Sequence, residues 1–243
     1  MEDIMKKLSL IIILALCSIA LFAQNVDWLW VKQAGGTDYD FGHSIAVDAN
    51  GNNYVTGSFS GSSTFGTTTL TSSGDKDIFV AKIDHNGNWL WANQAGGISY
   101  DYGRGIAVDD NGNSYITGEF EESAIFGTTT LTSSGDYDIF VAKIDHNGNW
   151  LWAKQAWGIG EDVGFSIAVD AKGNSYITGV FIESANFGTT TLTSSGDYDI
   201  FVAKLDINGN WLWAKQAGGT DDDYGNGIAV DANGNSYVTG YFS

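Results

Sequence analysis

The segment that decides the fold is Phe126–Ala156, FGTTTLTSSGDYDIFVAKIDHNGNWLWAKQA, which recurs almost unchanged as Phe187–Ala217. The two copies differ only at the positions of Ile144 and His146 in the first copy. A copy this faithful indicates duplication, and a fixed period over tens of residues is typical of solenoids, propellers and other repeat arrays. The repeat therefore outweighs local propensity in the inference of fold class.

The period is 61 residues and extends along the chain without insertion. Three sets of residues keep this spacing: Trp28, Trp89, Trp150 and Trp211; Ile45, Ile106, Ile167 and Ile228; Phe65, Phe126 and Phe187. Residues 24–243 are expected to form three full repeats and part of a fourth. The last repeat ends after its second expected strand, so we expect part of a longer array or an imperfectly closed ring. Trp28–Gln33 matches the last strand of later repeats and is the expected closing strand.

Each repeat is expected to contain four antiparallel strands. In the second copy they cover Gly105–Asp109, Tyr115–Phe120, Asp138–Asp145 and Trp150–Gln155. Asp, Asn and Gly at fixed offsets between strands one and two, and again between three and four, suit type I hairpin turns that end on a glycine with positive φ. Thr128–Gly135 is polar and β-prone, which predicts a long connection with a short hairpin of its own.

The side-chain pattern of these strands selects the architecture. Ile139–Ile144 is apolar on both alternating faces except at Lys143, so neither face of this strand is expected to meet solvent. Small antiparallel sheets covered on both faces are the blades of a β-propeller. Gly105 and Ala107 are small, as they should be in a strand near the axis. We predict an all-β fold, an incomplete β-propeller of 61-residue four-stranded antiparallel blades. A β-solenoid is the alternative, although its coils usually have a shorter period.

The first 23 residues predict a secretory signal peptide. Lys6 and Lys7 precede the mostly apolar run Leu8–Phe22, and Ala23 is a small residue suited to cleavage. The run is shorter than the roughly 20 residues of a spanning helix, so no membrane insertion is expected once the signal is removed. Cys17, the single cysteine, leaves with this segment, and the mature chain is expected to have no disulfide. We expect a secreted or cell-surface protein.

The net charge limits the classes of partner that the chain is expected to bind. A net charge of −18 argues against nucleic acid and anionic membranes, since both are polyanionic. Most of the acids recur with the repeat, and those in turns are expected to cap backbone N–H groups. A second acidic set precedes the first strand of each repeat. It is expected to form a solvated rim, with calcium or a basic partner as the alternative: Asp38, Asp40, Asp101, Glu161, Asp162 and Asp221–Asp223.

No metal or other cofactor is expected, with calcium as the alternative. The turn Asp48–Asn52 places oxygens at alternate positions, as calcium loops do. Its glycine comes two positions earlier than in an EF-hand, however, and no late bidentate glutamate follows. His43, His85 and His146 form no expected metal triad, because other residue types replace them in the remaining repeats.

The sequence contains no recognisable catalytic motif, whether nucleophile elbow, zinc-protease helix or phosphate loop. The inner strands repeat small or apolar residues, so no polar group unique to one repeat is expected around the axis. The paired tryptophans are expected to be buried between blades rather than to stack on sugars. Trp157 is the one candidate ligand contact, because it occupies a loop position held by Gly35, Gly96 and Gly218 in the other copies.

Three motifs of the second repeat resemble a known family. They are DYGRGIAVD at Asp101–Asp109, GNSYITG at Gly112–Gly118 and DIFVAKI at Asp138–Ile144. Together they resemble the SBBP-type β-propeller repeat of bacterial cell-surface proteins, and the resemblance covers Asn25–Ser243. It implies a propeller fold and an extracellular setting, and it implies no reaction. Members usually have Phe-Pro where this chain has Phe126-Gly127, which leaves the shape of that loop open.

Modular repetition, an export signal and the lack of unique polar clusters predict a non-enzymatic extracellular scaffold, adhesion or protein-interaction module. Its expected partner is a protein or a glycan, and its incomplete blade predicts self-association. One alternative is a carbohydrate- or calcium-dependent binding protein, based on Trp157 and the acidic loops. A second is an enzyme whose active site lies outside this sequence.

Overall fold

The computed structural model describes residues 28–243, and every regular element in that range is a β-strand. The fold belongs to the unit Lys32–Ser243. The predicted signal peptide lies outside the described residues. Within residues 28–243, no helix reaches the length and apolarity that crossing a membrane requires.

The first blade is a four-stranded antiparallel sheet whose strands follow in chain order. β2 (Asp40–Val47) pairs with β3 (Asn53–Phe59), β3 with β6 (Asp77–Ile83), and β6 with β7 (Trp89–Gly97). We call the first strand of each blade its inner strand and the fourth its outer strand.

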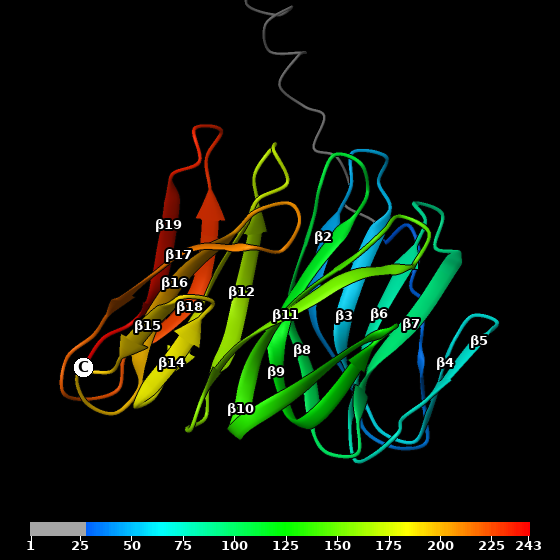
Figure 1. The fold of residues 1–243 in the computed structure, drawn as a ribbon. Coiled ribbons are helices and arrows are strands. Elements are labelled where there is room, and N and C mark those ends of the chain that lie inside the picture. Colours follow the sequence, from blue (N-terminus) through cyan, green and yellow to red (C-terminus); the bar gives the residue numbers. More distant parts are fainter. Residues whose placement is uncertain (1–27) are drawn as a thin grey trace, which may run out of the picture. The chain divides into compact units, whose positions relative to one another are not determined.

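The same sheet recurs along the chain. Blade 2 consists of β8 (Asp101–Val108), β9 (Ser114–Phe126), β10 (Thr129–Ile144) and β11 (Trp150–Gly158). Blade 3 consists of β12 (Val163–Val169), β13 (Ser175–Phe181), β16 (Asp199–Leu205) and β17 (Trp211–Ala217). Blade 4 has two described strands, β18 (Tyr224–Val230) and β19 (Ser236–Tyr241). Figure 1 shows the inner strands β2, β8, β12 and β18 side by side, as their mutual contacts require.

The prediction of antiparallel propeller blades is confirmed, and all pairs between named strands are antiparallel rather than the parallel coils of a solenoid. Two expectations need correction. Residues 28–34 form no strand, and Trp28 and Leu29 are 89% and 91% exposed, so the expected closing strand at Trp28–Gln33 is not formed. The second and third strands of blade 2 are also longer than predicted, because they run on into a hairpin.

That hairpin is inserted between the second and third strands of blades 1 to 3, and it ties neighbouring blades together. In blade 1 it is formed by β4 (Ser62–Phe65) and β5 (Thr68–Thr71), and in blade 3 by β14 (Ser184–Phe187) and β15 (Thr190–Thr193). Its first strand pairs with the end of the preceding outer strand, as Gly97 of β7 does with Ala124 of β9. β1 (Gly35–Gly36) pairs with β4 in the same way. The sequence placed a hairpin within Thr128–Gly135, whereas the hairpin of blade 2 pairs Ser123–Phe126 with Thr129–Thr132. The ladder between blades was not predicted.

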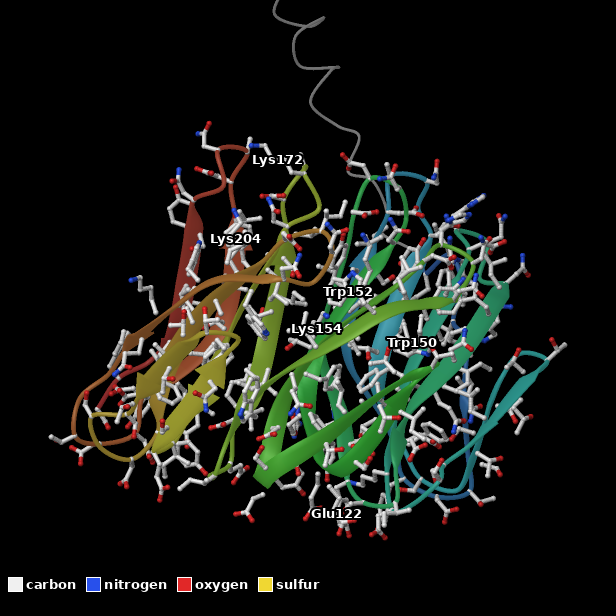
Figure 2. The ribbon with its side chains drawn as sticks, viewed as in Figure 1. Glu122, Trp150, Trp152, Lys154, Lys172 and Lys204 are labelled. Carbon is white, nitrogen blue, oxygen red and sulfur yellow. The ribbon has the colours of Figure 1, made fainter. Side chains whose placement is uncertain are left out.

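Each full blade is built around one aromatic group. In blade 2 the Phe126 ring lies 4.9 Å from the Phe140 ring and meets the Trp150 ring edge-on at 5.4 Å. Blades 1 and 3 repeat this arrangement. The paired tryptophans are only partly buried, although they pack against the core as expected. Figure 2 shows Trp150 and Trp152 on β11 in the middle of the chain's described part.

Two exceptions in the sequence pattern find their cause in the contacts. Lys143 interrupts an apolar strand because its ammonium lies 4.6 Å from the centre of the Tyr115 ring and 4.0 Å from Asp109 Oδ2. Gly105 is small because a Cβ atom there would lie 3.0 Å from the Phe165 carbonyl oxygen of the next inner strand. The close approach of inner strands expected from Gly105 is therefore confirmed.

The apolar faces of the first and last blades remain uncovered. Ile45 of β2 is 61% exposed, whereas its counterpart Ile106 of β8 is 6% exposed beneath blade 1. Tyr237 of β19 is 59% exposed, whereas Tyr115 of β9 is fully buried. The described blades thus form an incomplete propeller, as predicted.

Candidate functional site

The inner strands carry a β-bulge at one position where the four repeats hold four different residues. The register shifts on either side of this position in β2, β8, β12 and β18. The residues there are His43, Arg104, Phe165 and Asn226. Bulges redirect side chains and are common beside functional sites. The same backbone bulge therefore presents a different side chain in each blade.

A second variable position faces the start of each inner strand. It holds Ser58, Glu119, Val180 and Tyr241, which pair with Phe41, Tyr102, Val163 and Tyr224. Figure 2 marks this end of the blades by Glu122, at the lower edge, and the opposite end by Lys172. The residues that distinguish one blade from another therefore gather at one end of the inner strands.

We call the residues at this end of blades 1 and 2 the first inner-strand cluster: Phe41, His43, Lys76, Tyr102, Arg104 and Glu119. Its centre is the ion pair of Arg104 and Glu119, in which Arg104 Nε donates to Glu119 Oε1 at 2.8 Å and to Oε2 at 3.1 Å. The guanidinium also lies 4.7 Å from the centre of the Tyr102 ring. Burial raises the pKa of Glu119 to about 7, and Arg104 opposes that rise.

Lys76 and His43 complete the first cluster. The Lys76 ammonium lies 5.2 Å from the centre of the Phe41 ring and 5.3 Å from that of Tyr102. His43 Nδ1 lies 2.9 Å from the Gly103 carbonyl oxygen. Burial lowers the pKa of His43, and the charges of Arg104 and Lys76 lower it further. The cations of this cluster are therefore held by the chain's own aromatic rings and oxygens.

We call a group of residues at the same end of blades 3 and 4 the second inner-strand cluster: Glu161, Phe165, Tyr198, Asp222 and Tyr224. The Tyr198 hydroxyl donates to Glu161 Oε2 at 3.0 Å, and the Tyr198 ring lies 5.8 Å from that of Tyr224. The Phe165 and Tyr224 rings are stacked at 6.4 Å. This cluster combines aromatic rings with carboxylates.

The structure corrects the prediction that the acids before each inner strand form a solvated rim. Asp101 and Asp162 are fully buried and Asp223 is 2% exposed, whereas Asp38, Glu161 and Asp221 are exposed. The buried acids lie beside acids of the preceding blade. Burial is the main cause that raises the pKa of Asp101, and the charge of the neighbouring Asp77 raises it further. They are interior residues of the blade interfaces.

The turn aspartates behave as the capping interpretation predicts. Asp48 Oδ1 accepts the backbone N–H groups of Asn50 and Asn52 at 2.9 Å each. Its Oδ2 accepts the Asn52 amide at 2.8 Å and the Tyr54 hydroxyl at 3.2 Å. Within residues 28–243, no three His, Cys, Asp or Glu side chains converge as metal ligands.

Trp157 lies near the end of strand β11 rather than in the loop that the sequence suggested. It pairs with Asn186 of β14, whose amide donates to the Trp157 carbonyl oxygen at 3.3 Å. Its side chain is half-buried on the ladder between blades 2 and 3. The structure does not bring Trp157 together with the inner-strand clusters by any contact among the described residues.

The expectation that no polar group is unique to one repeat near the axis is wrong, because Arg104 and Glu119 are such a pair. Sequence reasoning missed it by weighing what the repeats share. The useful signal was variation between repeats. The repeat position of Arg104 holds a different residue type in each of the four repeats, and so does the repeat position of Glu119. Their pairing across β8 and β9 required the register of the blade.

Comparisons with known proteins agree with this fold. The SBBP profile, described as a β-propeller repeat, matches residues 29–58, 90–119 and 212–241. An uncharacterized WD repeat-containing protein of Acanthamoeba polyphaga mimivirus is 24% identical over 88% of this chain and 19% of its own length. The regulatory protein FlaEY of Caulobacter vibrioides is 25% identical over 69% of this chain and 18% of its own length. The chain thus spans less than a fifth of these relatives.

A solved protein of unknown function from Bacteroides caccae is similar at a TM-score of 0.42 and 14% identity, over 81% of this chain and 52% of that chain. The family match rests instead on the repeat. Its three matched stretches begin 61 or 122 residues apart, in step with the period, and each ends within the second strand of a blade. Three stretches of this chain therefore match the SBBP β-propeller repeat.

Proposed function

We propose that this chain is a non-enzymatic extracellular scaffold that binds a partner macromolecule through its inner-strand clusters. The observation that supports this proposal is the convergence of the variable positions. The frame is copied from blade to blade, while the bulge residues change from His43 to Arg104 to Phe165 to Asn226. A rigid frame that presents a varied surface is the usual arrangement of a binding protein, because binding residues need precise support.

The polar groups of the first cluster support binding rather than catalysis. Glu119 is held by Arg104 through two hydrogen bonds, and His43 faces a backbone carbonyl oxygen. A general base needs a free acceptor within hydrogen-bond reach of the group it deprotonates. Groups already paired with one another serve better as a fixed, charged surface.

The extracellular setting is supported by the charged, apolar and small segments of residues 1–23. We expect residues 1–23 to export a fused reporter enzyme that needs disulfide bonds for activity, since these form only outside the cytoplasm. The control fusion carries Leu10→Arg and Leu14→Arg within the apolar run. Equal reporter activity from both fusions would contradict the export signal.

Binding through the clusters is tested by selecting peptides from a random phage-displayed library on residues 24–243 and measuring their affinity for variants. We expect the double variant Tyr102→Ser, Tyr198→Ser to weaken selected peptides about tenfold or more, because aromatic anchors dominate binding energy. Asp110→Asn, in the turn at the opposite end of β8, is the matched control. Peptides that bind the double variant as well as the parent would place the binding surface elsewhere.

A further inference from the structure

The first inner-strand cluster shows how this surface treats a cation. Lys76 stands at the start of β6 and rests on the rings of Phe41 and Tyr102, at 5.2 and 5.3 Å from their centres. Arg104 rests on the same Tyr102 ring at 4.7 Å. Ammonium and guanidinium groups at such distances are attracted to the face of an aromatic ring. Blades 1 and 2 therefore supply their own cations to their own rings.

The second cluster has exchanged these residue types. The position of Lys76 is taken by Tyr198, and the position of Arg104 by Phe165. The repeat position that holds Tyr39 and Tyr100 in the first two repeats holds Glu161 and Asp222 in the last two. Where blades 1 and 2 have cations beside tyrosines, blades 3 and 4 have carboxylates beside aromatic rings.

The contacts show that these rings and carboxylates act on one another. Glu161 accepts the Tyr198 hydroxyl, and the Tyr198 backbone N–H lies 3.5 Å from Asp222 Oδ1. Burial raises the pKa of Tyr198, and the hydrogen bond and charge of Glu161 raise it further. Burial raises the pKa of Tyr224 too, with added contributions from the charges of Asp222 and Glu161. The rings lie in a negative field.

The nearest opposing charge is already engaged. Glu161 acts electrostatically on Arg104, but that guanidinium is bound to Glu119 and stacked on Tyr102. No lysine or arginine stands at the two exchanged positions of blades 3 and 4, which are Tyr198 and Phe165. The second cluster thus has the aromatic faces and carboxylates of a cation site, with the chain's own cations replaced.

We propose that the second inner-strand cluster binds a lysine or arginine side chain of a partner polypeptide. Glu161 and Asp222 pair with the charge, and the rings of Phe165, Tyr198 and Tyr224 contact it through their faces. This inference rests on the proposed binding function and names its partner, a basic segment. It also gives a use to part of the acidic set before the inner strands, for which the sequence left a basic partner as the alternative.

The experiment measures fluorescence anisotropy of a fluorescein-labelled Gly-Arg-Gly-Arg-Gly-Arg peptide with residues 24–243 at low salt, where exposed charges are least screened. The same peptide with glutamine in place of arginine is the ligand control. We expect the arginine peptide to bind and the glutamine peptide not to bind. Glu161→Gln combined with Asp222→Asn should weaken binding about tenfold, the loss expected for two partly exposed charge pairs and their aromatic support.

Two further variants separate a specific site from a merely acidic surface. Tyr198→Lys places a cation where Lys76 stands in blade 1, and it should abolish binding by occupying the site from within the chain. Tyr224→Leu keeps an apolar side chain but removes the ring, and it should weaken binding about threefold. Asp110→Asn, which removes an exposed charge at the other end of β8, should leave affinity unchanged. Urea denaturation of each variant confirms that it is folded.

The outcomes distinguish this inference from the proposed function. Arginine binding that Asp110→Asn weakens as much as the double variant would overturn the inference, and so would equal binding of the glutamine peptide. If library peptides depend on Tyr102 and Tyr198 but carry no lysine or arginine, the scaffold function stands and the basic partner is wrong. If no library peptide depends on those tyrosines, the binding function itself fails.

Discussion

Asp77 of blade 1 and Asp101 of blade 2 converge on one point beside Gly96. A Cβ atom at Gly96 would lie 2.7 Å from Asp77 Cγ and 2.8 Å from Asp101 Oδ2. Both aspartates are fully buried, and the Oδ1 atom of each accepts no hydrogen bond from the described residues. Two buried carboxylates this close cannot both be charged without a large penalty, so the pair retains a proton.

The same pair recurs at the next interface as Asp138 and Asp162. Burial raises the pKa of Asp77 and of Asp138 to about 6. Burial raises the pKa of Asp101 and of Asp162 to about 8. Backbone hydrogen bonds oppose this rise, and the charge of the partner aspartate adds to it. Glu121 adds to the negative charge around Asp101, and Glu161 to that around Asp162. The interfaces of blade 2 with blades 1 and 3 therefore hold titratable groups in the neutral range.

The first prediction is that stability falls as pH rises from about 4 to about 8. These folded-state pKa values lie above the unfolded value of 3.8, so the folded chain binds more protons. The stability they contribute is complete below the unfolded pKa and is lost as pH rises through about 6 and about 8. The capping aspartates act in the opposite sense, since chain donors hold the pKa of Asp48 below its usual value. Urea denaturation should therefore show maximal stability near about pH 4 and a marked decline that is nearly complete by about pH 8.

Asp101→Asn tests whether the pair of Asp77 and Asp101 causes the pH dependence of stability. An amide is neutral at all pH values and donates to Asp77, so the variant should exceed the parent by on the order of 2 kcal/mol at pH 8.5 and by much less at pH 5. Asp110→Asn is the exposed control and should leave the slope unchanged. A parent chain whose stability is flat or rises between pH 6 and 9 would contradict the shared proton.

The second prediction concerns the ladder between blades. A Cβ atom at Gly97 would lie 1.7 Å from the Ser123 carbonyl oxygen, so Gly97→Ala must part β7 from the hairpin of blade 2. We expect a loss of about 2 kcal/mol or more in the free energy of unfolding. Gly219 occupies the same repeat position, and its Cβ would have no neighbour closer than 3.8 Å. Gly219→Ala should therefore be nearly neutral, and equal losses from both substitutions would argue against the ladder as a source of stability.

The third prediction is that calcium has little effect on melting. Both oxygens of Asp48 already accept hydrogen bonds from the chain, as do those of Asp145 in the turn between β10 and β11. A site that binds only the folded state would add about 2.7 kcal/mol at a hundredfold excess of ligand over its dissociation constant. Differential scanning calorimetry with calcium and then with chelator should give the same Tm. A shift of several degrees would show that a metal replaces these hydrogen bonds.

The fourth prediction is that residues 24–243 self-associate through the face of β2. Ile45 and Val47 are 61% and 56% exposed there, whereas Ile106 is covered by blade 1. Apolar faces that need a neighbouring blade recruit other chains when that neighbour is absent. Light scattering should detect association that Ile45→Lys reduces, with little change in stability. In contrast, Ile106→Ala should cost about 2–4 kcal/mol, because it opens a cavity in a packed interface. A monodisperse parent chain would show that the exposed face is not adhesive.

The sequence by itself determined the blade. Its period marked the repeat, two-sided apolar strands such as Ile139–Ile144 marked sheets covered on both faces, and Asp-Asn-Gly turns marked the hairpins. These features depend on residues close together in the chain, where strand alternation and turn conformation follow from local sterics and hydrogen bonding. That is why the strand pattern of blade 2 was predictable, although its hairpin begins at Ser123, before the predicted segment Thr128–Gly135.

Only the tertiary structure decided what meets between blades. Asp101 was predicted to be solvated, yet it is buried against Asp77, because the stacking of blades and not the spacing of residues brings them together. Arg104 meets Glu119 through the register of β8 and β9, and the bulge at Arg104 sets where its side chain points. Repetition identifies the frame since every copy must satisfy the same packing. The functional surface comes from the positions free to differ, and their proximity is a property of the assembled blades.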